Sequence, residues 1–326
     1  MVDFTVAICT YNGAKRLPDV LDKLKACIES GRRSHPTLTW EIRIINNNST
    51  DETQQVIEQY QTQWTPDVPI YTHFEAQQGL AFARQCAVEQ AQGEWIGFLD
   101  DDNLPTENWI VSAYEFGREY PQAGAFGGLV KAAFEDTPPP GIERIQSFLA
   151  IVERGNVAFQ YQLKTGLLPP GAGLVVRKDA WLSSVPKQLF LKGRIGEVKL
   201  ASEDLEAVSL IQQKGWEIWH NPQMEISHKI PESRLQLDYL LTLIRGTGLA
   251  RHHIRMTRLT PWQRPLAFLI YFCNDLRCLL LFWLKNSSQI HQDLVTTCQW
   301  EWLRSSLMSP FYLWSQGAIY GESSQK

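Results

Sequence analysis

The chain has few cysteines, and they follow no pattern. Its six cysteines are scattered, with no Cys-x-x-Cys pair and no close spacing of cysteine and histidine. Zinc sites and disulfide frameworks both depend on such spacing, so neither is predicted, and a reducing, cytosolic compartment fits best. A signal peptide is not expected either. The basic start and long apolar core of a secretion signal are missing, because a strand-like run begins almost at the first residue.

The chain also lacks a strong excess of either charge. Its formal net charge is -4 over 326 residues, and nucleic acid is not among the expected partners. The charge is nevertheless uneven. Residues 239–326 hold nine Lys and Arg against four Asp and Glu, which leaves the rest of the chain at -9. The two parts are therefore expected to have different partners.

An uninterrupted membrane-spanning run is missing as well. Residues 265–284 approach the length of a span, but Asn274, Asp275 and Arg277 stand in the middle. A charge there costs roughly 2.5 to 3.5 kcal/mol on insertion scales, so a lone spanning helix is not expected. Aromatic and leucine residues mixed with arginine instead predict helices that lie in an anionic membrane interface; a plain helical subdomain or an oligomer interface is the alternative. The candidate anchors are Trp262, Trp283, Trp300, Trp302 and Trp314.

What the chain does have is a regular alternation of strand-like and helix-like segments. Strands that alternate with helices predict an α/β fold with a mostly parallel sheet flanked by helices. We expect this domain to span residues 1–238 and a helical, basic and aromatic region to span 239–326. The expected strands are 4–9, 40–45, 70–74, 95–99, 125–130, 174–176 and 216–219.

Three consecutive carboxylates, Asp100, Asp101 and Asp102, follow the strand-like run 95–99. Open α/β sheets bind ligands at the carboxyl ends of their strands. Neighbouring carboxylates repel one another unless a cation sits between them, and hard oxygen ligands suit Mg²⁺ or Mn²⁺. We therefore predict a divalent metal site at Asp100 and Asp102. The alternative is an acidic loop that caps the following helix.

Several motifs occur in an order that resembles the inverting glycosyltransferases of family 2, which have the Rossmann-like GT-A fold. The resemblance covers residues 2–235 and implies a nucleotide-sugar donor, Mn²⁺ or Mg²⁺, and a glycan or lipid-linked acceptor. Within the family the chain resembles bacterial exopolysaccharide enzymes, including those of hormogonium polysaccharide. The motifs are residues 6–12 (VAICTYN), 45–51 (INNNSTD), 79–85 (GLAFARQ), the acidic triplet and 202–205 (SEDL).

The resemblance also implies a set of donor-binding residues. The glycines of 171–173 let the backbone approach a sugar closely, although a simple turn would also need them. Family members usually carry Asp where this chain has Asn46 or Asn47. Because Asn can accept or donate, the base stays open between uridine, guanosine and thymidine, with a UDP-sugar as the first expectation. The implied residues are Thr10, Tyr11, Asn12, Asn46, Asn47, Arg84, Asp100, Asp101, Gly171, Ala172 and Gly173.

Inversion at a sugar carbon needs a base on the side opposite the leaving group. The resemblance gives this role to Asp204, since an aspartate is ionised at neutral pH and can take a proton from a hydroxyl. Glu203 is expected to orient the acceptor or the loop. The alternative is that both merely cap the helix that follows. His228 matches a place where some family members carry a histidine that binds the metal or contacts the diphosphate, and a structural histidine is the alternative.

Together these patterns predict an inverting, metal-dependent glycosyltransferase. We expect it to lie in the cytoplasm, peripherally at the inner face of the cell membrane, because of the basic and aromatic C-terminal region. A different class of protein is also conceivable: a scaffold that keeps the fold and binds a nucleotide sugar without turnover. The sugar and the linkage depend on the shape of the pocket, which the sequence does not specify.

Overall fold

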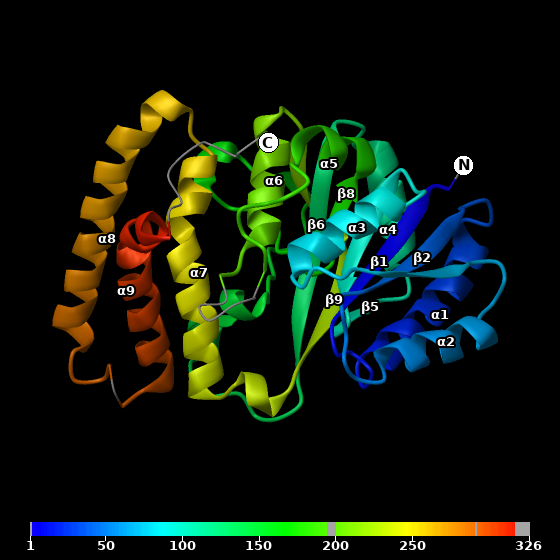
Figure 1. Ribbon diagram of the computed structural model, residues 1–326, viewed down its shortest axis with the longest axis horizontal. Helices are drawn as coiled ribbons and strands as arrows, with labels where there is room; N and C mark the ends of the chain where they lie inside the picture. The colour runs from blue at the N-terminus through cyan, green and yellow to red at the C-terminus, as the bar shows by residue number, and fades with distance from the viewer. Residues whose placement is uncertain (1, 194–199, 291, 317–326) are drawn as a thin grey trace.

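The computed structural model describes residues 2–193, 200–290 and 292–316, so residues 317–326 of the expected C-terminal region lie outside the described part. Short apolar, β-branched runs form the strands, and amphipathic segments form the helices between them (Figure 1). The strands are β1 (Phe4–Thr10), β2 (Trp40–Asn46), β3 (Ile70–Phe74), β4 (Trp95–Asp100), β5 (Asn103–Pro105), β6 (Ala123–Phe134), β7 (Phe159–Gln160), β8 (Val175–Arg177) and β9 (Glu217–Ile230). The α-helices are α1 (Leu17–Ser34), α2 (Thr53–Gln63), α3 (Leu80–Gln90), α4 (Trp109–Glu119), α5 (Lys178–Ser184), α6 (Glu203–Gln213), α7 (Leu237–Thr257), α8 (Arg264–Asn286) and α9 (Leu294–Ser315).

One sheet joins all of these strands, in the order β3-β2-β1-β4-β8-β6-β9-β5, with β7 paired to β9. The first four strands in this order, from β3 to β4, run parallel. Beyond β4, β8 is antiparallel to both of its neighbours, and β5 and β7 are antiparallel to β9, whereas β6 and β9 run parallel. The predicted α/β fold with a mostly parallel sheet is thus confirmed, and its later half is mixed.

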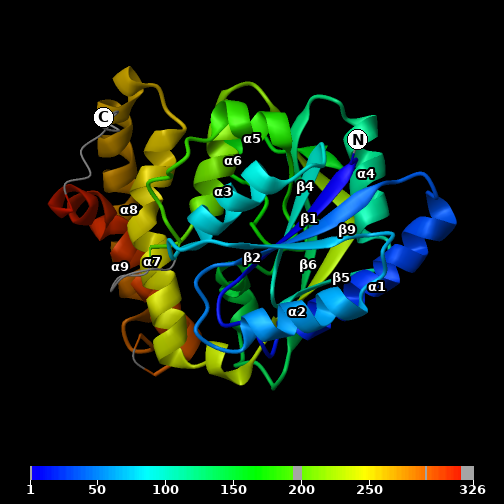
Figure 2. The same ribbon diagram turned by 45° about the vertical axis from the view of Figure 1, so that its right-hand side comes forward.

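The two faces of the sheet carry separate apolar cores, because alternate strand residues point to opposite sides. In β1, Val6 and Ile8 pack with the apolar faces of α1, α2 and α4. Ala7 and Cys9 point the other way and pack with α3, α5 and α6. Figure 2 shows α1 and α2 on one side of the sheet and α3 and α6 on the other. Helices on both faces fix the strands so that their carboxyl ends meet at one edge.

The strand expected at 216–219 is much longer than predicted. It is β9, which pairs with β6 as far as Phe134 and Ile230. A shift in the pairing register falls between Gly127 and Leu129 of β6, opposite residues 221–224 of β9. Pro222 lies in this irregular stretch, where a missing backbone N–H is tolerated. The bulge interrupts the alternation of side chains, which explains why the sequence pattern ended too early.

The predicted C-terminal helical extension is present as α7, α8 and α9. Of these, α7 packs directly on the α/β part, since Leu240, Leu243 and Ile244 share an apolar cluster with Leu149 and Ile230. In Figure 1, α8 stands at the outer edge of the molecule, with α9 and α7 between it and the sheet. The extension therefore begins as part of the main core and ends in a peripheral helix.

Gly97 of β4 yields a test of the packing between the sheet and α4. A Cβ at this position would lie 2.5 Å from Cη2 of Trp109 and 2.7 Å from Cζ of Phe4, whose rings meet edge to face. Overpacking of this kind costs about 1–3 kcal/mol. We expect Gly97→Ala to lower the free energy of unfolding by that amount, measured by urea denaturation.

Gly31 of α1 provides the matched control, because a Cβ there meets no heavy atom within 4 Å. Alanine favours helix over glycine by roughly 0.5–1 kcal/mol, so Gly31→Ala should leave stability unchanged or raise it slightly. Equal stability of the Gly97→Ala variant and the wild type would show that the aromatic packing adjusts freely.

Candidate active site

A cavity of about 590 Å³ opens at the carboxyl ends of the parallel strands. The sheet register places Thr10 beside Asn46 and Cys9 beside Asp100, so the ends of β1, β2 and β4 are level. Most of the predicted site residues line this cavity, although they are spread over most of the chain. They are Thr10, Tyr11, Asn47, Arg84, Asp100, Asp101, Asp102, Gly171, Ala172, Glu203, Asp204 and His228.

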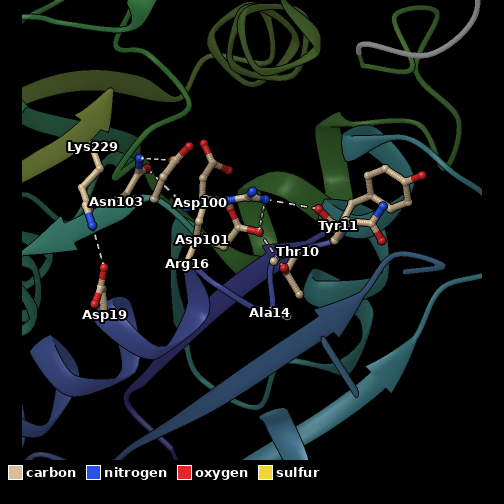
Figure 3. A network of polar contacts seen from close by, with 12 residues as sticks. Thr10, Tyr11, Ala14, Arg16, Asp19, Asp100, Asp101, Asn103 and Lys229 are labelled. Atoms are coloured by element: carbon tan, nitrogen blue, oxygen red, sulfur yellow. Dashed lines mark hydrogen bonds and ion pairs between the residues drawn. The ribbon is translucent and has the colours of Figure 1, made fainter. Parts of the chain in front are cut away.

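Asp101, the middle carboxylate of the triplet, is fixed by residues around the start of α1. Arg16 donates from Nε to Oδ1 at 2.8 Å and from Nη2 to Oδ2 at 3.0 Å, and the Thr10 hydroxyl donates to Oδ2 at 2.6 Å (Figure 3). A Cβ on Gly13 would lie 2.1 Å from Oγ1 of Thr10, so glycine is needed for this close approach. Asp101 therefore ties β4 to the turn after β1, in addition to lining the cavity.

Arginines from other elements face the two outer carboxylates. Nη2 of Arg84, on α3, lies 3.7 Å from Oδ1 of Asp100. Nη2 of Arg234, in the 3₁₀ turn Glu232–Arg234 after β9, donates to Oδ2 of Asp102 at 2.5 Å. Each carboxylate of the triplet thus has its own guanidinium, and three arginines supply positive charge around the triplet.

The two outer carboxylates differ in their electrostatic environment. Burial raises the pKa of Asp100 to about 6, and the nearby Asp102 charge adds to this, while Arg84 offsets it only in part. Burial also acts to raise the pKa of Asp102. There, however, the proximity of His228 and the charge of Arg234 are stronger, and the pKa falls well below its usual range. Asp102 is therefore a firmly ionised group.

His228 lies beside Asp102 because of strand pairing. In the register of β5 and β9, Asn103 stands opposite His228, and the Lys229 N–H donates to the Asp102 backbone oxygen at 2.9 Å. Nδ1 of His228 donates to the Leu149 carbonyl oxygen at 2.9 Å, which leaves the lone pair on Nε2. That nitrogen is 3.6 Å from Oδ1 of Asp102.

A carboxylate oxygen beside an imidazole nitrogen is a donor pair that suits Mn²⁺, so the residues present fit a divalent metal. Among the described residues, no three His, Cys, Asp or Glu side chains lie close enough together to enclose a metal by themselves. An ion held by Asp102 and His228 would need further ligands from a bound molecule. Phosphate oxygens are ligands of this kind.

Asp204, on α6, lines the same cavity as Asp102 and His228. It lies at the second position of that helix, after Ser202, whose φ of 84° is in the left-handed region. Its Oδ2 accepts the Gly171 N–H at 2.6 Å. A Cβ on Gly171 would lie 2.8 Å from Oδ2 of Asp204 and 2.6 Å from Nη2 of Arg84, so a side chain here would displace one of these groups. The backbone amide holds this carboxylate in a fixed direction.

Glu203 has a different environment from its neighbour Asp204. It is buried, and its Oε1 lies 3.5 Å from Nη1 of Arg84. The Arg84 guanidinium lies over the Phe98 ring, 5.5 Å from its centroid. It is also near a carboxylate oxygen of Asp100, so it links Glu203 to Asp100. The contacts give Glu203 and Arg84 the role of a rigid internal link.

Three predicted donor-binding asparagines are engaged in loop contacts. The Asn47 amide donates to the Glu75 and Gln77 carbonyls, and its oxygen accepts the Gly79 N–H. Asn46 accepts the Ser49 N–H and donates to Gln54, and Asn12 accepts the Thr50 N–H. Asn12, Asn46 and Gly173 do not line the cavity. The geometry therefore gives Asn12, Asn46 and Asn47 a role in holding the loops beside the cavity.

Sequence reasoning missed Arg16 and Arg234. Each is a lone arginine in a polar segment, Arg16 just before α1 and Arg234 just after β9. No local pattern marks Arg16. A weak signal was present for Arg234, since it follows the singled-out His228 within one short turn.

The sheet, its covering helices and the acidic edge define a GT-A glycosyltransferase fold. The profile of the family described as "Glycosyl transferase family 2" matches residues 5–180. The chain belongs to this family.

Named relatives share parts of the chain. It is 22% identical over 237 residues to the succinoglycan biosynthesis protein ExoM of Rhizobium meliloti, covering 72% of this chain and 69% of that one. It is 35% identical over 107 residues to a Bacillus subtilis glycosyltransferase named for teichuronic acid biosynthesis, TuaG, covering 32% of this chain. That match spans only 40% of the length of the Bacillus protein.

Two solved structures share the fold at low sequence identity. A Pyrobaculum calidifontis mannosyltransferase, solved with GDP-Man and Mn²⁺, superposes with a TM-score of 0.59 at 16% identity, covering 95% of this chain and 87% of that one. Residues 1–349 of S. aureus TarS, solved with UDP-GlcNAc, superpose with a TM-score of 0.51 at 14% identity, covering 98% and 93%.

The raised pKa of Asp100 leads to a stability prediction for the metal-free protein. The folded state binds the proton of Asp100 more tightly than the unfolded state does, so stability is lost as the pH rises from the ordinary carboxyl pKa of 3.8 through about 6. We expect Asp100→Asn in EDTA to raise the free energy of unfolding at pH 8 by on the order of 1 kcal/mol. The gain should shrink as the pH is lowered to 5, as followed by urea denaturation.

Asp136→Asn is a suitable control, because Asp136 is exposed and accepts only the neighbouring Thr137 N–H in the described contacts. Its effect should be small at both pH values. A loss of stability in Asp100→Asn at pH 8 would contradict the view that this carboxylate is repelled by its neighbours.

Proposed function

We propose that the chain is an inverting, metal-dependent glycosyltransferase that moves a sugar from a nucleoside-diphosphate donor to a glycan or lipid-linked acceptor. The observation that supports this most strongly is the arrangement around the cavity. Asp102 and His228 lie close enough to share an ion, and Asp204 is fixed by the Gly171 amide on the wall formed by α6. A leaving-group site and a base therefore share one pocket.

The donor diphosphate belongs beside Asp102 and His228 in this proposal. A divalent ion bound there would neutralise the leaving diphosphate without any proton transfer. Arg16 and Arg234 line the same part of the cavity and add positive charge. Tyr11 is 45% exposed and offers an aromatic face for the nucleotide base. Asn46 and Asn47 hold the surrounding loops, so the identity of the base depends on other groups.

Asp204 acts as the base. Its carboxylate accepts the proton of the acceptor hydroxyl while the hydroxyl oxygen bonds to the anomeric carbon. The bond from that carbon to the phosphate oxygen breaks, and the nucleoside diphosphate leaves with the electron pair. Attack from the face opposite the leaving group inverts the anomeric configuration. Glu203 and Arg84 position Asp204 and Asp100 but do not take the proton.

The acceptor enters from the side of α7. Phe148, Tyr239 and Leu243 line that wall and make it partly apolar, which suits an acceptor carried on a lipid. We retain a division of the chain near residue 238, but α7 completes the catalytic domain as well as beginning the C-terminal region. This sharing would couple acceptor binding to whatever α8 and α9 contact.

We place the protein peripherally at the cytoplasmic face of the membrane, with α8 as the contact. Residues 261–286 are long and apolar enough to span a membrane, with a mean hydropathy of 1.6, and only 6% of the apolar window is buried. Leu266, Ile270 and Leu284 are exposed, whereas Asp275 is buried and accepts from Arg251 and Arg255 of α7. At about 100° per residue, Asp275 faces away from Leu266 and Leu284. One apolar face is thus left outward, as in an interfacial helix.

The role of Asp204 is tested by Asp204→Asn in a panel of UDP-, GDP- and TDP-sugars with and without Mn²⁺. The amide cannot take the acceptor proton, so transfer should fall by about 10²–10⁴-fold. The affinity for the donor that the wild type binds should stay nearly the same, since Asp204 lies away from the diphosphate. Calorimetry measures binding, and NMR of the product's anomeric proton reports the configuration.

Asp179→Asn, an exposed change in α5, is the control and should transfer normally. Unchanged turnover in Asp204→Asn would remove Asp204 from the mechanism. A product that keeps the donor's configuration would refute inversion. A wild type that binds a donor but never transfers its sugar would favour the scaffold alternative.

Membrane contact is tested with a full-chain variant in which serine replaces four residues at once: Leu266, Ile270, Leu281 and Leu284. The wild type should sediment with phosphatidylglycerol liposomes at low salt, and the variant should lose most of this binding because its apolar stripe is gone. A matched control replaces Phe74, Val157, Leu167 and Leu182, which are equally exposed but lie elsewhere. Equal sedimentation of the two variants would contradict membrane contact through α8 and would favour an oligomer interface there.

A further inference from the structure

One guanidinium occupies both of the groups to which the proposed function assigns the metal. Nη2 of Arg234 donates to Oδ2 of Asp102 at 2.5 Å, and Nη1 donates to Nε2 of His228 at 3.0 Å. Because Nδ1 of His228 donates to the Leu149 carbonyl, Nε2 holds the lone pair that Arg234 uses. The guanidinium therefore spans the same two electron-pair donors that a divalent ion would take.

An N–H donor and a metal ion cannot share the lone pair of an imidazole nitrogen. A metal that binds His228 through Nε2 must therefore displace Arg234. Displacement also exchanges one positive charge for another beside Asp102, so the carboxylate does not lose its counter-charge. In the metal-free protein Arg234 supplies this charge and keeps Asp102 and His228 in position.

The other two arginines of the site hold carboxylates outside the proposed pair of metal ligands. The Arg84 side chain is 3% exposed and lies between Asp100 and Glu203. The Arg16 side chain is 41% exposed, but both of its hydrogen bonds to a carboxylate go to Asp101, which the Thr10 hydroxyl also holds. The Arg234 side chain is 22% exposed, lines the cavity and comes from a short turn rather than a long helix. Among the three, Arg234 is the arginine in contact with both groups that a metal would take.

We propose that Arg234 is an exchangeable counter-ion: it holds the empty metal site and moves to the donor diphosphate when metal and donor bind together. Arginine suits the second position because its planar fork matches phosphate oxygens. Metal binding would then be weak without nucleotide and strong with it. The inference rests on the proposed metal site at Asp102 and His228, and it makes Arg234 a positioning residue in the free enzyme and a diphosphate ligand in the complex.

The test measures binding of Mn²⁺ alone, and then of UDP and GDP with Mn²⁺, to the wild type, Arg234→Gln and Arg234→Lys. Calorimetry and the loss of the free Mn²⁺ EPR signal report binding without any need for activity. We expect Arg234→Gln to bind Mn²⁺ alone about tenfold or more tightly than the wild type, because a competitor has been removed. The same variant should bind the preferred nucleotide with Mn²⁺ about tenfold or more weakly, because a charged hydrogen bond is lost.

The sign of the first effect separates this role from ordinary support of a metal ligand. Loss of a residue that only orients the ligands weakens metal binding by about 10–100-fold. Weaker or unchanged binding of Mn²⁺ alone by Arg234→Gln would therefore overturn the inference while leaving the proposed function intact. If the wild type bound no Mn²⁺ even with nucleotide and Arg234→Gln did, Arg234 would replace the metal permanently, which also refutes exchange.

Two further arms keep the experiment decisive. Arg234→Lys retains the charge but cannot span Asp102 and His228 in the same fork, so it should shift Mn²⁺ affinity in the same direction by less, and it serves if the Gln variant does not fold. Arg144→Gln removes an exposed arginine that pairs with Asp293 and should change neither affinity. Failure of every variant and the wild type to bind Mn²⁺ under all conditions would refute the proposed metal site, and the exchange with it.

Discussion

The repulsion among three adjacent carboxylates at the end of β4 is the constraint on which the site depends. Asp100, Asp101 and Asp102 are brought together by a strand that cannot separate them, so positive charge must come from elsewhere in the chain. The fold supplies it from three directions, with Arg84 on α3, Arg16 before α1 and Arg234 after β9. These ion pairs also join the elements around the cavity. The arginines that neutralise the carboxylates are thus also part of the architecture. Their positive charges would suit a diphosphate.

The three pairs divide the work of structure and function. The pair of Arg16 with Asp101 fastens the turn after β1 to the end of β4, and Arg84 links Asp100 to Glu203 through the buried centre. Both join segments that are distant in the sequence. The third pair, Arg234 with Asp102, covers the groups that fit a metal. A site that is stable when empty yet open to a cation needs such a mixture of fixed and movable charges.

The C-terminal helices follow from a second constraint, the burial of apolar surface. Leu240, Leu243 and Ile244 of α7 complete a core that includes Ile230 at the end of β9, so α7 is held against the catalytic domain. The buried ion cluster around Asp275 then fixes one face of α8 against α7, which leaves the opposite apolar face without cover in the described structure. Packing on one side and exposure on the other decide which face of α8 points outward, and the composition of the helix alone does not.

By itself the sequence determined the fold class, the order of most strands and helices, and the clustering of Asp100 to Asp102 at a strand end, because hydrophobic periodicity and local motifs carry that information. It also singled out Asp204 and His228, through resemblance to a family. Only the tertiary structure decided which groups meet. The β5–β9 register brought His228 to Asp102, and loop contacts engaged Asn46 and Asn47. Arg16 and Arg234 became site residues through folding alone, since the approach of distant segments leaves no trace in the spacing of a single chain.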